Sequence, residues 1–223
     1  MDTGLMATGL EFVLGLAIGI NLWFLTEYLL HRFAMHRLKG RGIMSREHLQ
    51  HHVTAGWRFD GILILSWLGV AVVGAVGLPI NVVLLGWPIA LGMFVGWPFG
   101  YGFYEYQHAM AHLRPPHNRY QRWLRTSHFH HHFGHPNANH GVSIPLWDIV
   151  FGTRERPDVV RVPRRLAVGL AWLVDTADGA DGPSVELKAE FRDDYVLVGS
   201  VACDARQAGI DEARAFASLA PTD

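Results

Sequence analysis

The stretch that decides the fold is Ser127–Thr153, SHFHHHFGHPNANHGVSIPLWDIVFGT, which holds six of the 14 histidines of the chain. At its centre are His128, His131 and His132, spaced i, i+3 and i+4. On an α-helix these positions lie on one face, so three imidazoles point in the same direction. Neutral imidazole nitrogens are good ligands for iron, copper, zinc and nickel. The stretch therefore predicts a helix that presents histidines to a metal.

Two further groups of histidines have helical spacing. His48, His51 and His52 repeat the i, i+3, i+4 pattern, and His108 and His112 form an i, i+4 pair. A single group of this kind is compatible with buried structural histidines. The exact repetition of one pattern favours a shared metal-binding role.

The first pair in the chain, His31 and His36, is five residues apart. On an ideal α-helix these two side chains diverge by about 140°. We therefore expect a helix end or bend between them. With this pair, ten histidines fall into four boxes. The other four are predicted to be solvated or hydrogen-bonded histidines: His117, His130, His135 and His140.

Three apolar segments have lengths that suit a bilayer: Gly9–Leu30, Gly61–Gly77 and Val82–Tyr104. About 20 apolar residues are needed to cross the hydrocarbon core as a helix. The second and third segments are separated by Leu78–Asn81, which contains a proline and predicts a turn. A GxxxG pattern, Gly15–Gly19, allows close packing against another helix.

Basic residues alternate with these apolar segments. Residues 32–58 contain six Lys or Arg and residues 114–165 contain nine, whereas residues 59–113 contain none. Basic loops face the cytoplasm. We therefore predict an all-α integral membrane domain, residues 1–165, with three transmembrane helices, an external N-terminus and a cytoplasmic histidine-rich helical cap that contains all four boxes.

The remaining residues, 166–223, form an acidic tail with 11 acidic and four basic residues. A surface helix is expected over Arg164–Asp175, and alternating apolar residues predict strands over Val185–Phe191 and Tyr195–Ala202. With a helix over Asp204–Leu219, the tail is predicted to be a small soluble ββα unit.

Composition excludes several classes of protein. The formal net charge of −1 gives no reason to expect nucleic-acid binding. The single cysteine, Cys203, excludes an intramolecular disulfide and a site built from several cysteines. No histidine lies from Asp178 onward, so we expect the metal centre to form without that part of the tail.

The four boxes, in this order around an apolar hairpin, resemble those of the fatty acid hydroxylase superfamily, which includes sterol desaturases and fatty acid 2-hydroxylases. The resemblance covers about residues 20–155. Flanking residues are similar to the fatty acid 2-hydroxylase branch, and they are Glu27–Phe33, Gly141–Ser143, Pro145–Asp148 and Val150–Thr153.

The resemblance implies a membrane enzyme with a histidine-bound di-iron centre on the cytoplasmic face. Such an enzyme uses O₂ and external electrons to hydroxylate a lipid C–H bond, most simply on a fatty acyl chain. No catalytic residue beyond the metal ligands is identified. The implied ligands are His31, His36, His48, His51, His52, His108, His112, His128, His131 and His132.

Two departures from the family pattern are expected to matter. One span precedes the first box, where relatives commonly have two, and no cytochrome b5 domain is fused to the chain. The resemblance therefore implies a separate electron donor, cytochrome b5-like or ferredoxin-like with its reductase. Alternatives are a hydroxylase or desaturase of a sterol or carotenoid, a membrane metal carrier and a haem protein.

Overall fold

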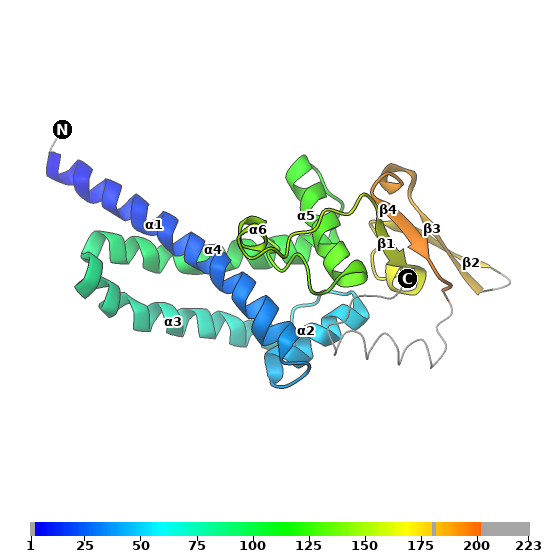
Figure 1. Ribbon diagram of the computed structural model, residues 1–223, viewed down its shortest axis with the longest axis horizontal. Coiled ribbons are helices and arrows are strands. Elements are labelled where there is room, and N and C mark those ends of the chain that lie inside the picture. The colour runs from blue at the N-terminus through cyan, green and yellow to red at the C-terminus, as the bar shows by residue number, and fades with distance from the viewer. Residues whose placement is uncertain (1–2, 180–181, 202–223) are drawn as a thin grey trace. The chain divides into compact units, whose positions relative to one another are not determined.

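The computed structural model describes residues 3–179 and 182–201 (Figure 1). The helix predicted over Asp204–Leu219 lies outside the described residues. The chain divides into two compact units, each built from two segments that are distant in sequence. The first contains Met1–Glu27 and Arg58–Tyr106, and the second contains Tyr28–Trp57 and Gln107–Asp223.

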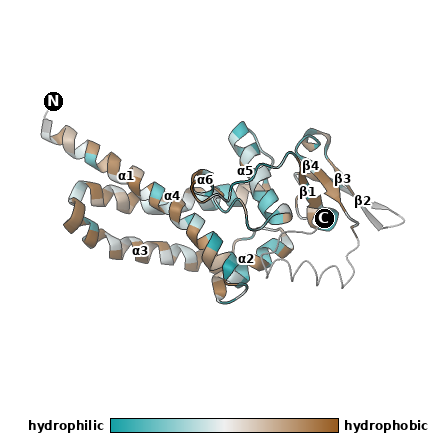
Figure 2. Cartoon of the chain, viewed as in Figure 1, coloured by the Kyte–Doolittle hydropathy of each residue, from teal (hydrophilic) through white to brown (hydrophobic). Residues whose placement is uncertain are grey.

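Three long helices contribute to the first unit: α1 (Thr3–Leu29), α3 (Gly61–Leu85) and α4 (Trp87–Leu113). Their residues are predominantly apolar along most of their length (Figure 2). Helix α3 begins after Asp60, whose Oδ1 accepts hydrogen bonds from the amides of Ile62 (3.0 Å) and Leu63 (3.2 Å). These bonds satisfy two of the amide groups that have no partner within the helix.

The turn between α3 and α4 lies later than the sequence predicted. Helix α3 continues through Pro79, and Gly86 ends it with a φ of 84°. A proline removes one hydrogen bond but does not reverse the chain, whereas glycine adopts a positive φ at no steric cost. The prediction of a turn at Leu78–Asn81 is therefore wrong. Pro88 lies in the first turn of α4, where its missing N–H costs nothing.

Helices α1 and α4 approach so closely that only glycine fits between them. A Cβ at Gly15 would lie 2.1 Å from the carbonyl oxygen of Ile89. On the facing helix, a Cβ at Gly96 would lie 2.3 Å from the carbonyl oxygen of Leu16. The predicted packing role of the Gly15–Gly19 pattern is confirmed, and Gly92–Gly96–Gly100 is its counterpart on α4.

Two helices among the described residues are long and apolar enough to cross a membrane, Gly4–Arg37 and Gly61–Leu85. Helix α4 is not one of them. Its second half contains polar and ionisable side chains, among them Glu105 and His108. The arrangement with three spans remains a prediction.

The second unit begins with a π-helix, η1 (Leu30–Arg37), followed by α2 (Ile43–Thr54). After the last turns of α4 come α5 (Arg119–Phe129) and a second π-helix, η2 (His130–Gly134). The Asn118 side chain caps α5 by accepting a 2.9 Å hydrogen bond from the amide of Gln121. The short helix α6 (Leu146–Val150) completes this part.

Four short strands follow. Strand β1 (Val160–Pro163) pairs in parallel with β4 (Tyr195–Val198). Strands β2 (Val174–Gly179) and β3 (Gly182–Leu187) form an antiparallel hairpin. Helix α7 (Arg164–Ala167) and a 3₁₀ turn (Ala189–Phe191) connect these strands.

The expectation of a helix over Arg164–Asp175 is therefore wrong beyond its first turn. The helix ends at Ala167 and Val174 begins β2. Leu170, Leu173 and Val174 are all buried. They are buried by packing against the strands rather than by lying on a membrane surface, and the sequence periodicity does not distinguish these two causes.

A hydrophobic core joins the tail to the histidine-bearing helices. Phe129, the last residue of α5, packs with Trp172, Val185, Phe191 and Tyr195. Because Phe129 is adjacent to His128, the tail supports the helix that carries this histidine. This packing argues against the expectation that residues from Asp178 onward are dispensable.

We predict that Gly96→Ala destabilises the first unit by about 1–3 kcal/mol, because the new methyl group overlaps the backbone of α1. Gly69→Ala on α3 is the matched control, since no atom lies within 4 Å of its Cβ position. The midpoint of unfolding in detergent measures both. Equal midpoints for the two variants would contradict the close packing.

We predict that Phe191→Ala lowers stability by about 3–5 kcal/mol and loosens metal binding, because it leaves a cavity beside Trp172 and Tyr195, the two rings that pack against Phe129. Val196→Ala, at an exposed position of β4, is the control and should cost little. Denaturant unfolding with metal analysis tests both. Unchanged metal affinity in a destabilised Phe191→Ala protein would show that the tail does not support the site.

Candidate metal centre

The ten histidines of the four boxes meet in two groups of five within the second unit. In each group the candidate ligand nitrogens all lie within 4.8 Å of one another. Nine of the ten side chains are buried and His51 is half-buried. The first group contains His31, His36, His48, His52 and His131, and the second contains His51, His108, His112, His128 and His132.

The two boxes with i, i+3, i+4 spacing divide between the groups. From the last box, His128 and His132 join the second group, while His131 joins the first. In the box on α2, His51 separates from its two neighbours in the same way. The sequence predicted that all three side chains of a box point the same way, so this detail is wrong. Each such box instead contributes to both groups.

The two groups adjoin each other. The rings of His52, from the first group, and His132, from the second, are stacked with centroids 4.1 Å apart and planes 9° apart. Two separate nitrogen clusters therefore lie side by side, which is the arrangement expected for a centre with two metal ions.

The π-helix η1 explains how His31 and His36 meet. A π-helix forms its hydrogen bonds between residues i and i+5, so residues five apart lie nearly above one another. The two rings have centroids 5.1 Å apart. The expectation of a helix end or bend between His31 and His36 is wrong, because the helix continues through the pair to Arg37. A local change of helix type, rather than a break, brings the pair together.

Backbone carbonyls orient four of the rings. The Nδ1 atoms of His31 and His131 donate hydrogen bonds to the carbonyls of His140 (2.5 Å) and Ala138 (2.7 Å). In the second group, His51 Nδ1 donates to Gly56 (2.7 Å) and His112 Nδ1 donates to Ala55 (2.9 Å). A carbonyl oxygen only accepts, so these Nδ1 atoms carry the proton. Their Nε2 lone pairs therefore point into the groups.

These inward nitrogens lie very close to one another. His31 Nε2 is 3.0 Å from His48 Nε2, and His112 Nε2 is 2.9 Å from His128 Nε2. Both ring nitrogens of His132 are buried without a hydrogen-bond partner among the described residues. Converging lone pairs and an unsatisfied buried nitrogen are costly unless a cation binds them. The residues thus fit a metal ion in each group.

The rings are suited to this role because they are neutral near pH 7. Burial lowers the pKa of His51 to about 4. Burial and the neighbouring histidines hold the pKa values of His48 and His132 well below the usual range. A neutral imidazole supplies the lone pair that a metal needs. All-nitrogen sites of this kind accept iron, copper, zinc and nickel.

Asp148 positions the loop that holds His31. Its Oδ1 accepts hydrogen bonds from the amide of His140 (2.8 Å) and the hydroxyl of Thr153 (2.7 Å), and its Oδ2 accepts from the amide of Gly141 (2.7 Å). The carbonyl of His140 in turn accepts from His31. No sequence pattern predicts this role, although Asp148 lies in the Pro145–Asp148 segment that is similar to the 2-hydroxylase branch.

His140 is a hydrogen-bonded histidine, which is one of the two alternatives that the sequence predicted, and it is not solvated. Only 2% of its surface is exposed. Its ring lies 5.4 Å from those of His31 and His131, and its Nε2 lies 3.1 Å from the carbonyl of Asn137. It packs against the first group without belonging to it.

Arg125 joins the helices that carry the second group. This side chain is 1% exposed and donates to the carbonyls of Met110 (2.6 Å) and Arg114 (2.9 Å) at the end of α4. Trp172 lies 5.9 Å from the guanidinium and donates to the carbonyl of Ala111 (3.1 Å). The carbonyls of Ala111 and Arg114 lie at the helix end, next to His112, where no later amide of the helix pairs with them, whereas the carbonyl of Met110 also accepts from the amide of Arg114.

His130 lies outside both groups. Its Nε2 is 2.8 Å from Glu155 Oε2, and Glu155 Oε1 is 2.5 Å from His135 Nδ1. These contacts tie η2 to the loop after α6. His117 is exposed and also lies outside the groups.

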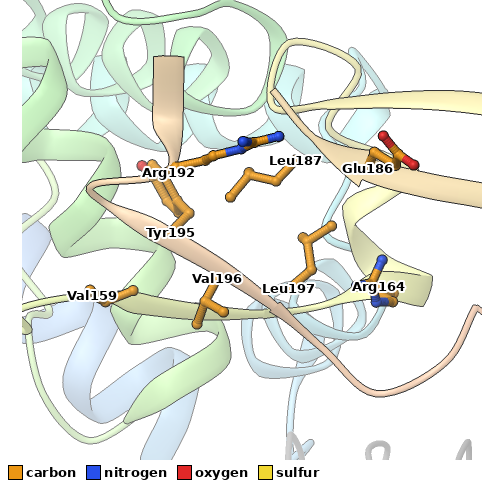
Figure 3. A pocket seen from close by; sticks show the side chains of 8 residues that line it. All are labelled: Val159, Arg164, Glu186, Leu187, Arg192, Tyr195, Val196 and Leu197. Carbon is orange, nitrogen blue, oxygen red and sulfur yellow. The ribbon is translucent and has the colours of Figure 1, made fainter. Parts of the chain in front are cut away.

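An open pocket of about 630 Å³ lies elsewhere in the second unit, against β3 and β4 and beside the two residues that flank β1, Val159 and Arg164 (Figure 3). Its walls combine Arg164, Glu186, Arg192 and Tyr195 with apolar side chains. None of the ten histidines lines it, so this pocket is separate from the candidate metal centre.

Buried histidine clusters on helices, in a chain with helices long enough to span a membrane, define a class of membrane-associated metalloproteins. The chain belongs to the fatty acid hydroxylase family, whose sequence profile matches residues 16–153. The family resemblance inferred from the four boxes is therefore confirmed.

Curated relatives have related names. Fatty acid 2-hydroxylase of Macaca fascicularis is 35% identical over 147 residues, which cover 61% of this chain and 38% of the relative. A dihydroceramide fatty acyl 2-hydroxylase of Arabidopsis thaliana is 31% identical over 139 residues, covering 61% of this chain and 59% of the relative. The match thus spans less than two thirds of each relative.

A solved structure has a similar fold. It is full-length scs7p, in which only the hydroxylase domain is visible. The two chains superpose with a TM-score of 0.50 at 25% identity, over 69% of this chain and 58% of the other.

We predict that His131→Ala lowers metal affinity by at least about 100-fold, because losing a ligand should cost no less than losing a group that orients one. His130→Ala should retain metal, since its ring contacts Glu155 and joins neither group. Metal content of the purified membrane proteins measures both. Loss of metal from His130→Ala with retention in His131→Ala would overturn the ligand assignment.

Proposed function

We propose that this chain is a membrane-bound, O₂-dependent di-iron oxygenase that hydroxylates a lipid C–H bond, most directly on a fatty acyl chain near its carboxyl end. The observation that carries the proposal is the pair of adjoining five-histidine groups. The names of the curated relatives support the choice of an acyl chain as substrate.

In this proposal each group of five holds one iron. When bound, the pair supplies the oxidising power that is needed to break an unactivated C–H bond with O₂ and two external electrons. The residues of the chain hold the ligands in place. The carbonyls at Ala138 and His140 fix ring tautomers, and Asp148 fixes the loop that presents the second of these carbonyls.

The burial of the histidines has a second consequence. Because nine of the ten are buried, the chain largely shields both groups from bulk water. Exclusion of water strengthens electrostatic interactions within a site and limits side reactions. A lipid substrate, which is apolar along most of its length, matches such a site better than a charged soluble metabolite does.

We further propose a multi-pass topology with three spans, an external N-terminus and both histidine groups on the cytoplasmic side. The basic segments 32–58 and 114–165 support this orientation. A separate protein, cytochrome b5-like or ferredoxin-like with its reductase, supplies the electrons. We also propose the division into a membrane domain, residues 1–165, and an acidic tail.

Other functions are less well supported. A sterol or carotenoid hydroxylase or desaturase would use the same histidines, so only the product distinguishes it. A metal carrier needs sites that release their ion, whereas these rings are tightly held and mostly buried. A haem protein needs a planar pocket, whereas the candidate ligand nitrogens of each group lie within 4.8 Å of one another.

We predict that cells expressing the chain accumulate lipids with one added oxygen on the acyl chain. A variant that combines His131→Ala and His132→Ala should lose this product by at least about 100-fold, because each group loses a ligand. Mass spectrometry of the lipid extracts, normalised to membrane-inserted protein, measures it. An added oxygen on a sterol instead would favour the alternative function, a sterol hydroxylase.

Reconstitution of apo-protein separates redox chemistry from other metal chemistry. Iron should restore O₂-dependent turnover and zinc should not, although imidazole sites bind zinc well. Turnover with zinc alone would contradict the proposed mechanism.

A further inference from the structure

The loop that connects the first two histidine boxes is strongly basic. Between Tyr28 and Arg46 the chain contains no Asp or Glu. The exposed cations of this basic loop are Arg37, Lys39, Arg41 and Arg46, and none of the four forms an ion pair with a described residue. The loop therefore presents uncompensated positive charge to its surroundings.

Apolar side chains alternate with these cations. Leu38 is 45% exposed, Ile43 47% and Met44 39%. Cations interspersed with exposed aliphatic side chains are typical of segments that lie on a lipid surface. The loop also directly follows a helix long enough to span a membrane, which ends at Arg37.

The backbone holds the basic loop in a defined shape. Ser45 is fully buried, and its Oγ accepts a 2.9 Å hydrogen bond from the amide of Gly40 and donates a 2.6 Å bond to the carbonyl of Met35. Lys39, Gly40 and Gly42 have positive φ values. Non-glycine residues rarely adopt this conformation, so the loop is shaped by specific contacts rather than being an unconstrained linker.

The same contacts connect the loop to the first histidine group. Met35 precedes His36, and Ser45 lies three residues before His48. The amide of Lys39 donates a 3.0 Å hydrogen bond to the carbonyl of His36. Any contact that fixes the position of the loop therefore also fixes the backbone next to His36 and His48.

We propose that the basic loop, residues 37–46, which includes the first turn of α2, docks on an anionic lipid surface. Its cations bind lipid phosphates while Leu38, Ile43 and Met44 enter the headgroup region. Clusters of basic residues immediately after a transmembrane helix bind anionic lipid in this way. The proposal rests on the proposed membrane placement and does not require hydroxylase activity.

Reconstitution of the full chain in nanodiscs tests the docking. A bimane probe at Leu38→Cys, in a Cys203→Ser background, reports contact with lipids carrying bromine on the acyl chain. Quenching should be stronger in discs of phosphatidylcholine with phosphatidylglycerol than in phosphatidylcholine alone. High salt should weaken the difference, because it screens exposed charges.

Substitution of the four loop cations by Gln should abolish the increase in quenching that phosphatidylglycerol causes, since each cation contributes to surface binding. The matched control replaces four exposed arginines of the same unit with Gln, namely Arg114, Arg119, Arg156 and Arg192. The control should keep the dependence of the original chain.

The comparison of the two lipid mixtures needs no substitution of the cations in the basic loop. It therefore remains decisive if the variant with four Gln in this loop does not fold. Equal quenching in both mixtures would overturn the proposal. An equal loss of quenching in the loop variant and in the control variant would also overturn it. These quenching outcomes do not depend on hydroxylase activity. A chain that produces no hydroxylated lipid would therefore still test the docking of the loop.

Discussion

The convergence of imidazole lone pairs is the constraint on which the rest of the second unit depends. Nitrogen atoms about 3 Å apart in a buried volume repel one another unless a cation binds between them. The surrounding structure resists this repulsion in three ways. Carbonyls fix four Nδ1 protons, Asp148 fixes a loop, and Arg125 joins α5 to the end of α4. The tail core around Phe129 supports the same helices from another side.

Sequence alone identified the parts that depend on local pattern. All ten histidines that meet in the structure lie in the four boxes. Eight of them are marked by i, i+3 or i+4 spacing, which is a direct sign of a shared helical neighbourhood. The Gly15–Gly19 pattern also correctly indicated close helix packing. Both signals are carried by residue identity at fixed spacing, which a single chain displays without any knowledge of its tertiary structure.

What the sequence did not reveal depends on tertiary contacts. The division of each box between two groups follows from how helices pack, and no periodicity encodes it. The turn at Gly86 was missed because a proline at position 79 is the stronger local signal. The strand at Val174 was read as helix because burial against β-strands and burial against lipid favour the same apolar residues. Arg125 gives no sign in the sequence that it is buried.

The sharing of boxes between groups has a thermodynamic consequence. Helix α2 supplies His48 and His52 to one group and His51 to the other, and the segment His128–His132 is divided in the same way. On the proposed assignment, the first ion to bind orders both segments and so reduces the entropy that the second ion must overcome. Loading is then positively cooperative, and partly metallated chains are scarce. The two sites behave as one thermodynamic unit even though no histidine bridges them in the proposed assignment.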